Sequence, residues 1–409
     1  MAEEKALLIN IATILAKDVL LDSREKKAIT YPSYPLQVFS DDDDDDDGLE
    51  LLVFEMQQKR KYPFNSYEKV ISLSDSSEED YQGDLLRNGR SSPPRTRRKD
   101  MSLHLEEYFT KNEFEKNMHM SKQTFNKILR SLTPFVERHM KSIDGINISE
   151  KTFISLGLWK LATDEHLEEM SRRFKIPLGI CHWTINNFCS LLSSNLRIFA
   201  KWPAHTASLN HQGEGFPKLS GIIALQQIDV FFESQDEEAS FILQLICGLD
   251  KQIIDCHVDL AASYSFDRTP FAERMRSQHK LLPTDCYLIG DASLPLRTYL
   301  IRPFAKPSTD SEKRFNDLLE NKRSTMNCVL NKMVKRFHSL YALETKNIRD
   351  LKRTLETICV LHNLCQVHRD TVVEECSIYY SNVATRRFGD ERDEGGRRRR
   401  AELLESMNL

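Results

Sequence analysis

The chain has 409 residues, 40% of them hydrophobic and 29% charged, and this length suggests two to three domains with a sizeable core. Sixty-one acidic residues against 57 basic ones give a net charge of −4, which by itself identifies no class of partner. No apolar run reaches the roughly 18 residues of a membrane-spanning helix, and charged residues interrupt the N-terminal segment, which excludes a signal peptide. The nine cysteines form no Cys-x-x-Cys pair, so the sequence predicts reduced thiols in the cytosol or nucleus and no structural zinc site.

Residues 1–100 are predicted to be mostly disordered. They contain an aspartate run, Asp41–Asp47, and an acidic serine-rich stretch, Ser72–Asp80, which cannot bury enough apolar surface to offset their ordering entropy. Ser72–Asp80 fits a phosphorylation target or, preferably, a solvated spacer. A basic cluster follows, which fits a nuclear import signal, a phosphate-binding arm or a solubilising linker. Its members are Arg95, Arg97, Arg98 and Lys99.

Residues 101–215 have the pattern of a helical module. Apolar side chains recur at helical spacing from Phe114 to Val136, and Ser121 is well placed to cap the helix that it precedes. Three further helices are predicted after these, with a break at Lys175-Ile176-Pro177 before the last one. They are Ser149–Leu161, which we interpret as amphipathic, Glu165–Phe174 and Gly179–Leu192.

The last two of these helices and the short break between them have the arrangement of a helix-turn-helix DNA-binding motif. An ordinary antiparallel helix pair that packs on a core has the same pattern, and it is the preferred reading unless DNA is known to be near. Trp183 and Phe188 are predicted core residues. The candidate DNA contacts are Arg172, Arg173, Lys175, His182 and Asn186.

Residues 216–370 change to strands flanked by helices, which predicts an α/β layer domain. The predicted strands are Leu219–Ala224, Ile242–Cys247, Gln252–Val258 and Asp285–Asp291, with a hairpin turn at Gly248–Lys251. Two helices follow, Asp310–Tyr341 and Leu351–His368. Residues 371–409 are predicted to be a charged, loose tail with a second basic cluster, Arg397–Arg400, and a short final helix, Arg400–Met407.

The motif Gly290-Asp291, followed by Pro295-Leu296 and Thr298–Pro303, resembles the transposase-derived nucleases of the Harbinger (PIF/Harbinger) group of the DDE superfamily. Three more segments carry the resemblance in the same order, and the similarity covers about residues 105–370. They are Phe216–Gly221, then Phe315-Asn316 with Arg323 and Lys335–Phe337, and Cys359–Cys365. The resemblance implies an α+β or α/β fold, with an RNase H-like mixed sheet flanked by helices behind the helical module.

Nucleases of this kind use carboxylates to hold two divalent metal ions, Mg²⁺ or Mn²⁺, which activate water and stabilise the leaving oxygen. The resemblance implies four acidic positions. In this chain Asp267 and Asp291 fill the middle two, whereas Ala224 and Asn327 stand at the first and the last. Because neutral groups are poor substitutes for anionic oxygen ligands, we expect at most a weak metal site at Asp267 and Asp291.

Neighbouring acids are not expected to replace the missing ligands. If the first strand continues, Asp229 lies on the opposite face from Ala224 and roughly 16 Å along the strand. Glu320 precedes Asn327 by two helical turns and falls about 10 Å short. Asp291 itself fits either a metal ligand or a strand-end residue that caps the next turn.

The sequence therefore predicts a domesticated Harbinger-type transposase that has lost nuclease activity and binds DNA, chromatin or a protein in the nucleus. The resemblance implies a Myb-like DNA-binding protein as partner. Two alternatives stay open. One is a metal-dependent DNA endonuclease with an atypical ligand set, and the other is a structural interaction protein without nucleic-acid contact.

Overall fold

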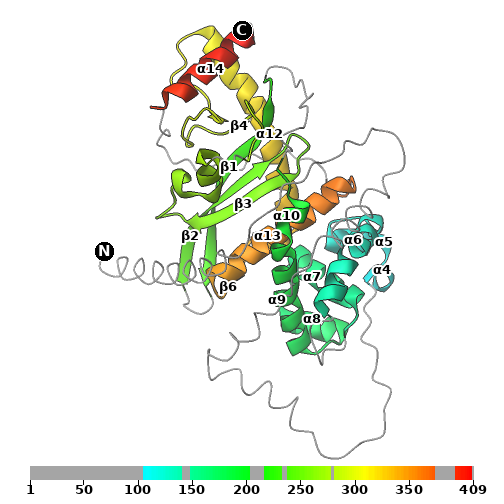
Figure 1. Ribbon diagram of the computed structural model, residues 1–409. Helices are drawn as coiled ribbons and strands as arrows, with labels where there is room; N and C mark the ends of the chain where they lie inside the picture. The colour runs from blue at the N-terminus through cyan, green and yellow to red at the C-terminus, as the bar shows by residue number, and fades with distance from the viewer. Residues whose placement is uncertain are drawn as a thin grey trace, which may run out of the picture. The chain divides into compact units, whose positions relative to one another are not determined.

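The computed structural model of the protein describes residues 105–140, 148–202, 216–232, 237–277, 281–373 and 392–407. These residues belong to two compact units, which divide between Leu191 and Leu192 (Figure 1). The region predicted to be disordered, residues 1–100, lies outside the described residues together with its basic cluster. Within the described ranges, no helix has the length and apolar character needed to cross a membrane.

The first unit is helical, as predicted. Ser121 caps α6, since its Oγ accepts a hydrogen bond from the backbone N–H of Thr124 at 3.1 Å. Ser149 caps α7 in the same way through Thr152. The helices are α4 (Leu105–Tyr108), α5 (Lys111–Met118), α6 (Lys122–Met140), α7 (Glu150–Thr163), α8 (Leu167–Phe174) and α9 (Leu178–Ser194).

The core of this unit is organised around α7. The helix was expected to be amphipathic, but its side chains are buried on almost every side, because neighbouring helices surround it. Phe188 of α9 is fully buried and its ring centroid lies 6.0 Å from that of Phe153, which confirms it as a core residue. Trp183 also contacts Phe153 but is only partly buried. A Cβ at Gly157 would lie 2.3 Å from the Phe188 ring, so glycine is what allows α7 and α9 to approach this closely.

The second unit contains a six-stranded mixed sheet with the order β3-β2-β1-β4-β5, and β6 pairs with the far part of β1. Strand β2 is antiparallel to β1 and β3, whereas β4 and β6 are parallel to β1 and β5 is parallel to β4. The mixed sheet flanked by helices is the fold class that the sequence predicts. The strands are β1 (Leu219–Phe232), β2 (Glu237–Cys247), β3 (Ile253–Leu260), β4 (Tyr287–Ile289), β5 (Leu300–Ile301) and β6 (Leu343–Thr345).

Helices cover both faces of this sheet. On one face, Ile223 and Leu225 pack in a cluster with Phe271 of α11 (Pro270–Arg276), next to the 3-10 turn η2 (Phe266–Arg268). On the other face lie α12 (Asp310–Arg336) and α13 (Ile348–Val367). The thiol of Cys256 in β3 lies beside that of Cys359 in α13. The strand residues paired in register with Cys256 are Leu245 of β2 and, beyond it, Ala224 of β1. Ala224 therefore faces the side of α12 and α13.

The pair His362-Asn363 in α13 fixes the β2–β3 hairpin to the rest of the unit. The side chain of Asn363 accepts from the N–H of Ile253 and donates to its C=O, both at 2.7 Å. The Nε2–H of His362 donates to the carbonyl of Lys251 at 3.0 Å. Burial lowers the pKa of His362 to about 4, so its imidazole is neutral. The segment Cys359–Cys365 was singled out in the sequence only by the family resemblance, and these contacts of His362 and Asn363 give it a structural role.

The C-terminal helix α14 (Glu394–Ser406) packs on α12 and β5. It begins earlier than predicted, because Asp393 caps it by accepting from the N–H of Gly396 at 2.6 Å. Arg400 is buried: its guanidinium lies 4.0 Å from the centroid of the Phe304 ring and donates to two backbone carbonyls. Arg399 donates to a third carbonyl, at Asp285. This part of the tail is therefore an integral element of the fold.

Candidate functional site

Ala224 lies in the central strand at the position where the resemblance implies the first acidic ligand. Strand β1 continues to Phe232, so Asp229 lies in the same strand as Ala224. Asp229 is exposed and accepts a hydrogen bond from Ser240 of β2 at 2.5 Å. At an odd offset along one strand, Asp229 and Ala224 point to opposite faces, and Asp229 does not complete a site at Ala224.

Asp291 lies beside this position, just after β4. Strands β1 and β4 are parallel with Ile222 opposite Ile289, and continuing that register brings Asp291 next to Ala224. A Cβ at Gly290 would lie 3.1 Å from the side chain of Ile223, which packs with Phe271 of α11. Gly290, the residue between Ile289 and Asp291, therefore faces the α11 side of the sheet. Asp291 consequently shares the α12 face with Ala224.

The carboxylate of Asp291 is buried and has two kinds of contact. Its Oδ1 accepts from the N–H of Ser293 at 2.8 Å and from the Ser293 hydroxyl, so it caps the turn after β4. Its Oδ2 accepts no hydrogen bond and lies 3.8 Å from Nη2 of Arg323 in α12. A guanidinium is therefore the cation next to this carboxylate.

Helix α12 brings the last of the four positions to the same place. Asn327 is partly buried and follows Arg323 by four residues, which puts the two side chains one turn apart on one helix face. Glu320 is half-exposed and its carboxylate lies 2.5 Å from Nη1 of Arg323. Glu320 thus pairs with an arginine and does not take the place of Asn327.

Asp267 has a separate environment in η2. Its side chain is 47% exposed, and both of its oxygens lie within 3.2 Å of Nη2 of Arg297. Its backbone carbonyl accepts from Arg276. Each of the two retained acids therefore lies beside an arginine, Arg297 for Asp267 and Arg323 for Asp291, and Arg323 is shared with Glu320.

The residues at the four positions do not fit a two-metal centre. Only two of them are carboxylates. The methyl group of Ala224 cannot bind a metal ion, and the amide of Asn327 offers a neutral oxygen in place of an anionic one. Across the described ranges, no group of three or more His, Cys, Asp and Glu side chains is placed to hold a metal ion. The site can bind and orient through its arginines, and it supplies two anionic carboxylates in place of four.

Tyr264 is a neighbour of the site that the sequence did not single out. Burial, followed by the negative charge of Asp291, raises the pKa of the Tyr264 phenol above its ordinary value. The protonated hydroxyl donates to Oε1 of Gln244, a buried side chain of β2, at 2.8 Å. Only the fold brings Tyr264 near Asp291, so no local pattern could have revealed it.

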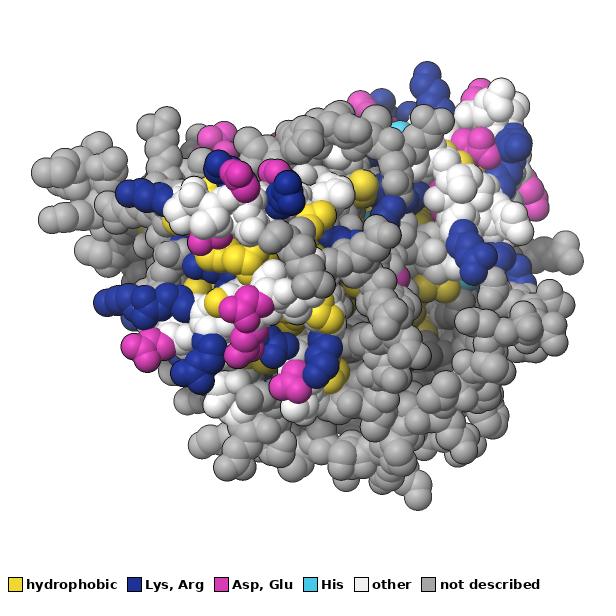
Figure 2. All heavy atoms as spheres, turned by 90° about the horizontal axis from the view of Figure 1, so that it is seen from above, with side chains coloured by type: hydrophobic (Ala, Val, Ile, Leu, Met, Phe, Trp, Pro, Cys, Tyr) yellow, Lys and Arg dark blue, Asp and Glu magenta, His cyan; other side chains and the backbone are white. Residues whose placement is uncertain are grey.

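On the face that Figure 2 shows, Lys and Arg side chains of the described residues lie among Asp and Glu side chains. Binding of the DNA backbone depends on basic side chains that are gathered on one surface. The predicted DNA contacts all belong to α8, α9 and the turn between them, in the first unit.

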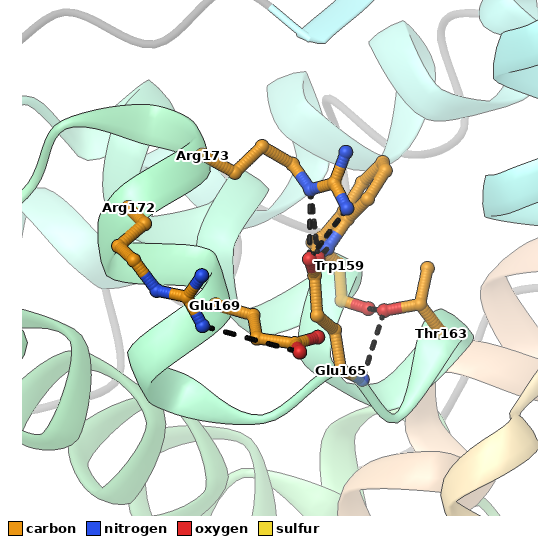
Figure 3. A network of polar contacts seen from close by, with 6 residues as sticks. All are labelled: Trp159, Thr163, Glu165, Glu169, Arg172 and Arg173. Carbon is orange, nitrogen blue, oxygen red and sulfur yellow. Dashed lines mark hydrogen bonds and ion pairs between the residues drawn. The ribbon is translucent and has the colours of Figure 1, made fainter.

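The five predicted DNA contacts differ in how they are held (Figure 3). Arg173 is bound by Glu165, with Nε at 2.8 Å from Oε1 and Nη2 at 2.7 Å from the same oxygen. Arg172 is 76% exposed, and its Nη2 lies 4.0 Å from Oε1 of Glu169 in an exposed ion pair. Lys175 is exposed in the turn, and His182 and Asn186 are exposed on α9. At these residues the structure has two helices joined by a short turn, α8 and α9.

Comparison with known proteins identifies the second unit. Residues 223–363 match the family model described as DDE superfamily endonuclease. The matched segment runs from β1 to α13 and includes Ala224, Asp267, Asp291 and Asn327. This segment of the second unit is therefore similar to DDE superfamily endonucleases. No curated protein and no solved structure matched the chain.

Proposed function

We propose that this chain is a domesticated Harbinger-type, transposase-derived protein without nuclease activity, which binds DNA, chromatin or a protein partner in the nucleus. The observation that carries the proposal is the pairing of Asp291 with Arg323 in the face that also holds Ala224 and Asn327. A guanidinium there neutralises the carboxylate without supplying the Lewis acidity that phosphodiester hydrolysis needs.

Charge repulsion supports the same conclusion. Arg323 is buried, so a divalent cation bound to Asp291 would have to share the carboxylate with a guanidinium that water does not screen well. Like charges at about 4 Å repel by about 4 kcal/mol per pair of unit charges at an effective dielectric of about 20. Glu320 offsets part of the Arg323 charge, and the repulsion that remains disfavours a metal pair held by Asp267 and Asp291 alone.

A cleavage assay tests the proposal. The full chain is incubated with supercoiled plasmid and with labelled duplex in Mg²⁺ or Mn²⁺, next to a variant with Asp267→Ala and Asp291→Ala. The expected result is no nicking by the parent above the level of the variant. Metal-dependent cleavage that the double variant lacks would overturn the proposal.

One observation favours the alternative, a metal-dependent DNA endonuclease with an atypical ligand set. The Oδ2 atom of Asp291 is buried and accepts no hydrogen bond, and a small cation would satisfy such an oxygen. The same assay decides between the two functions. The third possibility, a structural interaction protein, predicts no salt-dependent binding to duplex DNA.

The partner and the nuclear residence are proposed on the family resemblance and the sequence. A Myb-like DNA-binding protein is the expected partner, and affinity capture from nuclear extract with and without nuclease treatment distinguishes direct from DNA-mediated association. For residence, a tagged full chain is followed in cells after alanine replacement of the first basic cluster. Unchanged nuclear accumulation would show that the cluster Arg95, Arg97, Arg98 and Lys99 is not the signal.

A further inference from the structure

Arg173 is fixed in place by the helix that precedes it. Glu165, only 8% exposed, binds the Arg173 guanidinium through both Nε and Nη2 and also accepts from Nε1–H of Trp159 at 2.6 Å (Figure 3). The same guanidinium lies over the Trp159 ring, 5.8 Å from its centroid. These contacts join the C-terminal part of α8 to α7, and they occupy the guanidinium face that a phosphate would need.

The turn between α8 and α9 is also well defined. Lys175 has a left-handed φ of 55° and its N–H bonds to the carbonyl of Ser171, which ends α8. Ile176 is buried, and its backbone carbonyl accepts from the Ser171 hydroxyl at 2.7 Å. The direction in which α9 leaves α8 is therefore set by backbone contacts and one buried side chain.

The N-terminal half of α9 presents an open polar face. Gly179, His182 and Asn186 follow one another at helical spacing and are all exposed. A Cβ at Gly179 would have no atom within 4 Å. The His182 and Asn186 side chains bond to none of the described residues, so their hydrogen-bonding groups are available to a ligand.

Helix α9 carries no acidic side chain that would repel a polyanionic ligand. From Lys175 to Ser194 the sequence has no Asp or Glu, whereas Glu165, Glu168 and Glu169 before and within α8 balance Arg172, Arg173 and Lys175 in number. A helix fits the roughly 12 Å wide major groove of B-form DNA, whereas the deep, narrow groove of A-form RNA excludes it. Asn side chains bond adenine edges in pairs of hydrogen bonds, and residues near the start of the second helix are those that reach bases in helix-turn-helix proteins.

We propose that α9 enters the major groove of duplex DNA, where His182 and Asn186 read base edges while Arg172 and Lys175 contact phosphates. Arg173 touches no DNA and is a positioning residue, which holds α8 on α7. This inference rests on the DNA-binding part of the proposed function and divides the predicted contacts into three roles. It makes Asn186 the residue on which base preference depends.

Base reading is tested with the full chain and a pool of random duplexes. Duplexes enriched by the parent are compared with scrambled duplexes. The Kd for the scrambled duplex divided by the Kd for the enriched duplex measures discrimination. Asn186→Ala should lower this ratio about 5- to 150-fold, the equivalent of the about 1–3 kcal/mol of one bidentate base contact. Affinity for scrambled duplexes should stay the same, because phosphate contacts are retained.

The adjacent residue provides a matched control. Asn187 donates from Nδ2 to the carbonyl of Trp183 at 2.9 Å and lies 3.2 Å from His139, so its amide serves the fold. Asn187→Ala should lower the melting temperature and keep the discrimination ratio. If Asn186→Ala leaves the ratio unchanged, α9 does not read bases through this residue and the inference is wrong.

The roles of Arg172 and Arg173 are distinguished by two measurements: the salt dependence of DNA binding, and the direction in which Glu165→Gln changes the affinity. Arg172→Ala should reduce the slope of log K against log salt by about one. Glu165→Gln should weaken DNA binding, because α8 loses its attachment to α7, and Arg173→Ala should add little in the double variant. If Arg173 contacted DNA directly, Glu165→Gln would release the guanidinium and strengthen binding, which would overturn the assigned role.

The outcomes also separate this inference from the function on which it rests. Salt-dependent binding by the parent that none of the α8 or α9 variants alters would leave the proposed DNA binding standing and refute the role of α9. No binding of any duplex by the parent, even at low salt, would refute both.

Discussion

Replacing His362 with glutamine should remove a pH dependence of stability that burial creates. In the folded chain the His362 imidazole donates to the carbonyl of Lys251, and burial, with lesser effects of the Arg336 and Lys332 charges, lowers its pKa to about 4. Glutamine can keep a donor near the position of Nε2 but has no proton to gain. The variant therefore isolates the titration from the hydrogen bond.

The magnitude follows from the difference between the two pKa values. In the unfolded chain a histidine titrates near 6.5, so below that pH unfolding takes up a proton that the folded chain does not hold. With a folded pKa of about 4, the free energy of unfolding falls by about 2 kcal/mol between about pH 7.5 and 5.0. The contribution of neutral His362 is complete above about pH 6.5 and is lost as the pH falls toward 4.

Urea unfolding followed by circular dichroism measures this loss, as the difference between parent and His362→Gln at each pH. The difference is needed because burial raises the pKa of Asp255 and of Glu356, and those carboxylates change stability in the opposite direction. Both proteins contain them, so their effect cancels. A parent-minus-variant difference that is the same at pH 7.5 and pH 5.0 would refute the reasoning and show that protons reach His362 in the folded chain.

Three further predictions concern metal binding, a buried ion pair and packing. Ala224→Asp combined with Asn327→Glu should enlarge the rise in melting temperature that Mn²⁺ causes, because two anionic oxygens return, whereas equal rises in variant and parent would contradict the residue assignment. Asp370→Asn should lower the free energy of unfolding by about 3–5 kcal/mol in a denaturant titration, because it leaves a buried guanidinium uncompensated. The exposed pair of Asp310 is the control, and Asp310→Asn should cost less than about 1 kcal/mol. Gly157→Ala should cost about 1–3 kcal/mol, since its Cβ would lie 2.3 Å from an aromatic ring of α9, and an unchanged melting temperature would contradict this.

The strands of the sheet core were predictable because their apolar runs are long and turn residues bound them. The second half of β1, after Ala224, was missed, since most of its side chains alternate between more and less buried positions and include Asp229. Strands β5 and β6 were missed because two or three residues carry no period. These elements become strands only through the neighbours with which they pair.

The site was predictable in its residues but not in its contacts. The resemblance located Asp291 and Asn327, and the structure places Arg323 beside Asp291 and one helical turn before Asn327, although it is 32 positions from Asp291 in the sequence. Local pattern carries no information on such a pairing. Likewise, the two glycines at the start of α14 disfavour a helix, and only the packing of Arg400 and the cap at Asp393 offset that preference.

The burial of Arg400 limits which arginines of the C-terminal basic cluster a binding partner can reach. A run of four arginines fits a nuclear import signal only where a partner can reach its side chains. Here Arg399 and Arg400 hold α14 onto the fold, and within this run only Arg397 and Arg398 are exposed. A partner that binds all four arginines would therefore have to detach α14 from the fold. Detachment of this helix would also expose Phe304 and the carbonyls beside it.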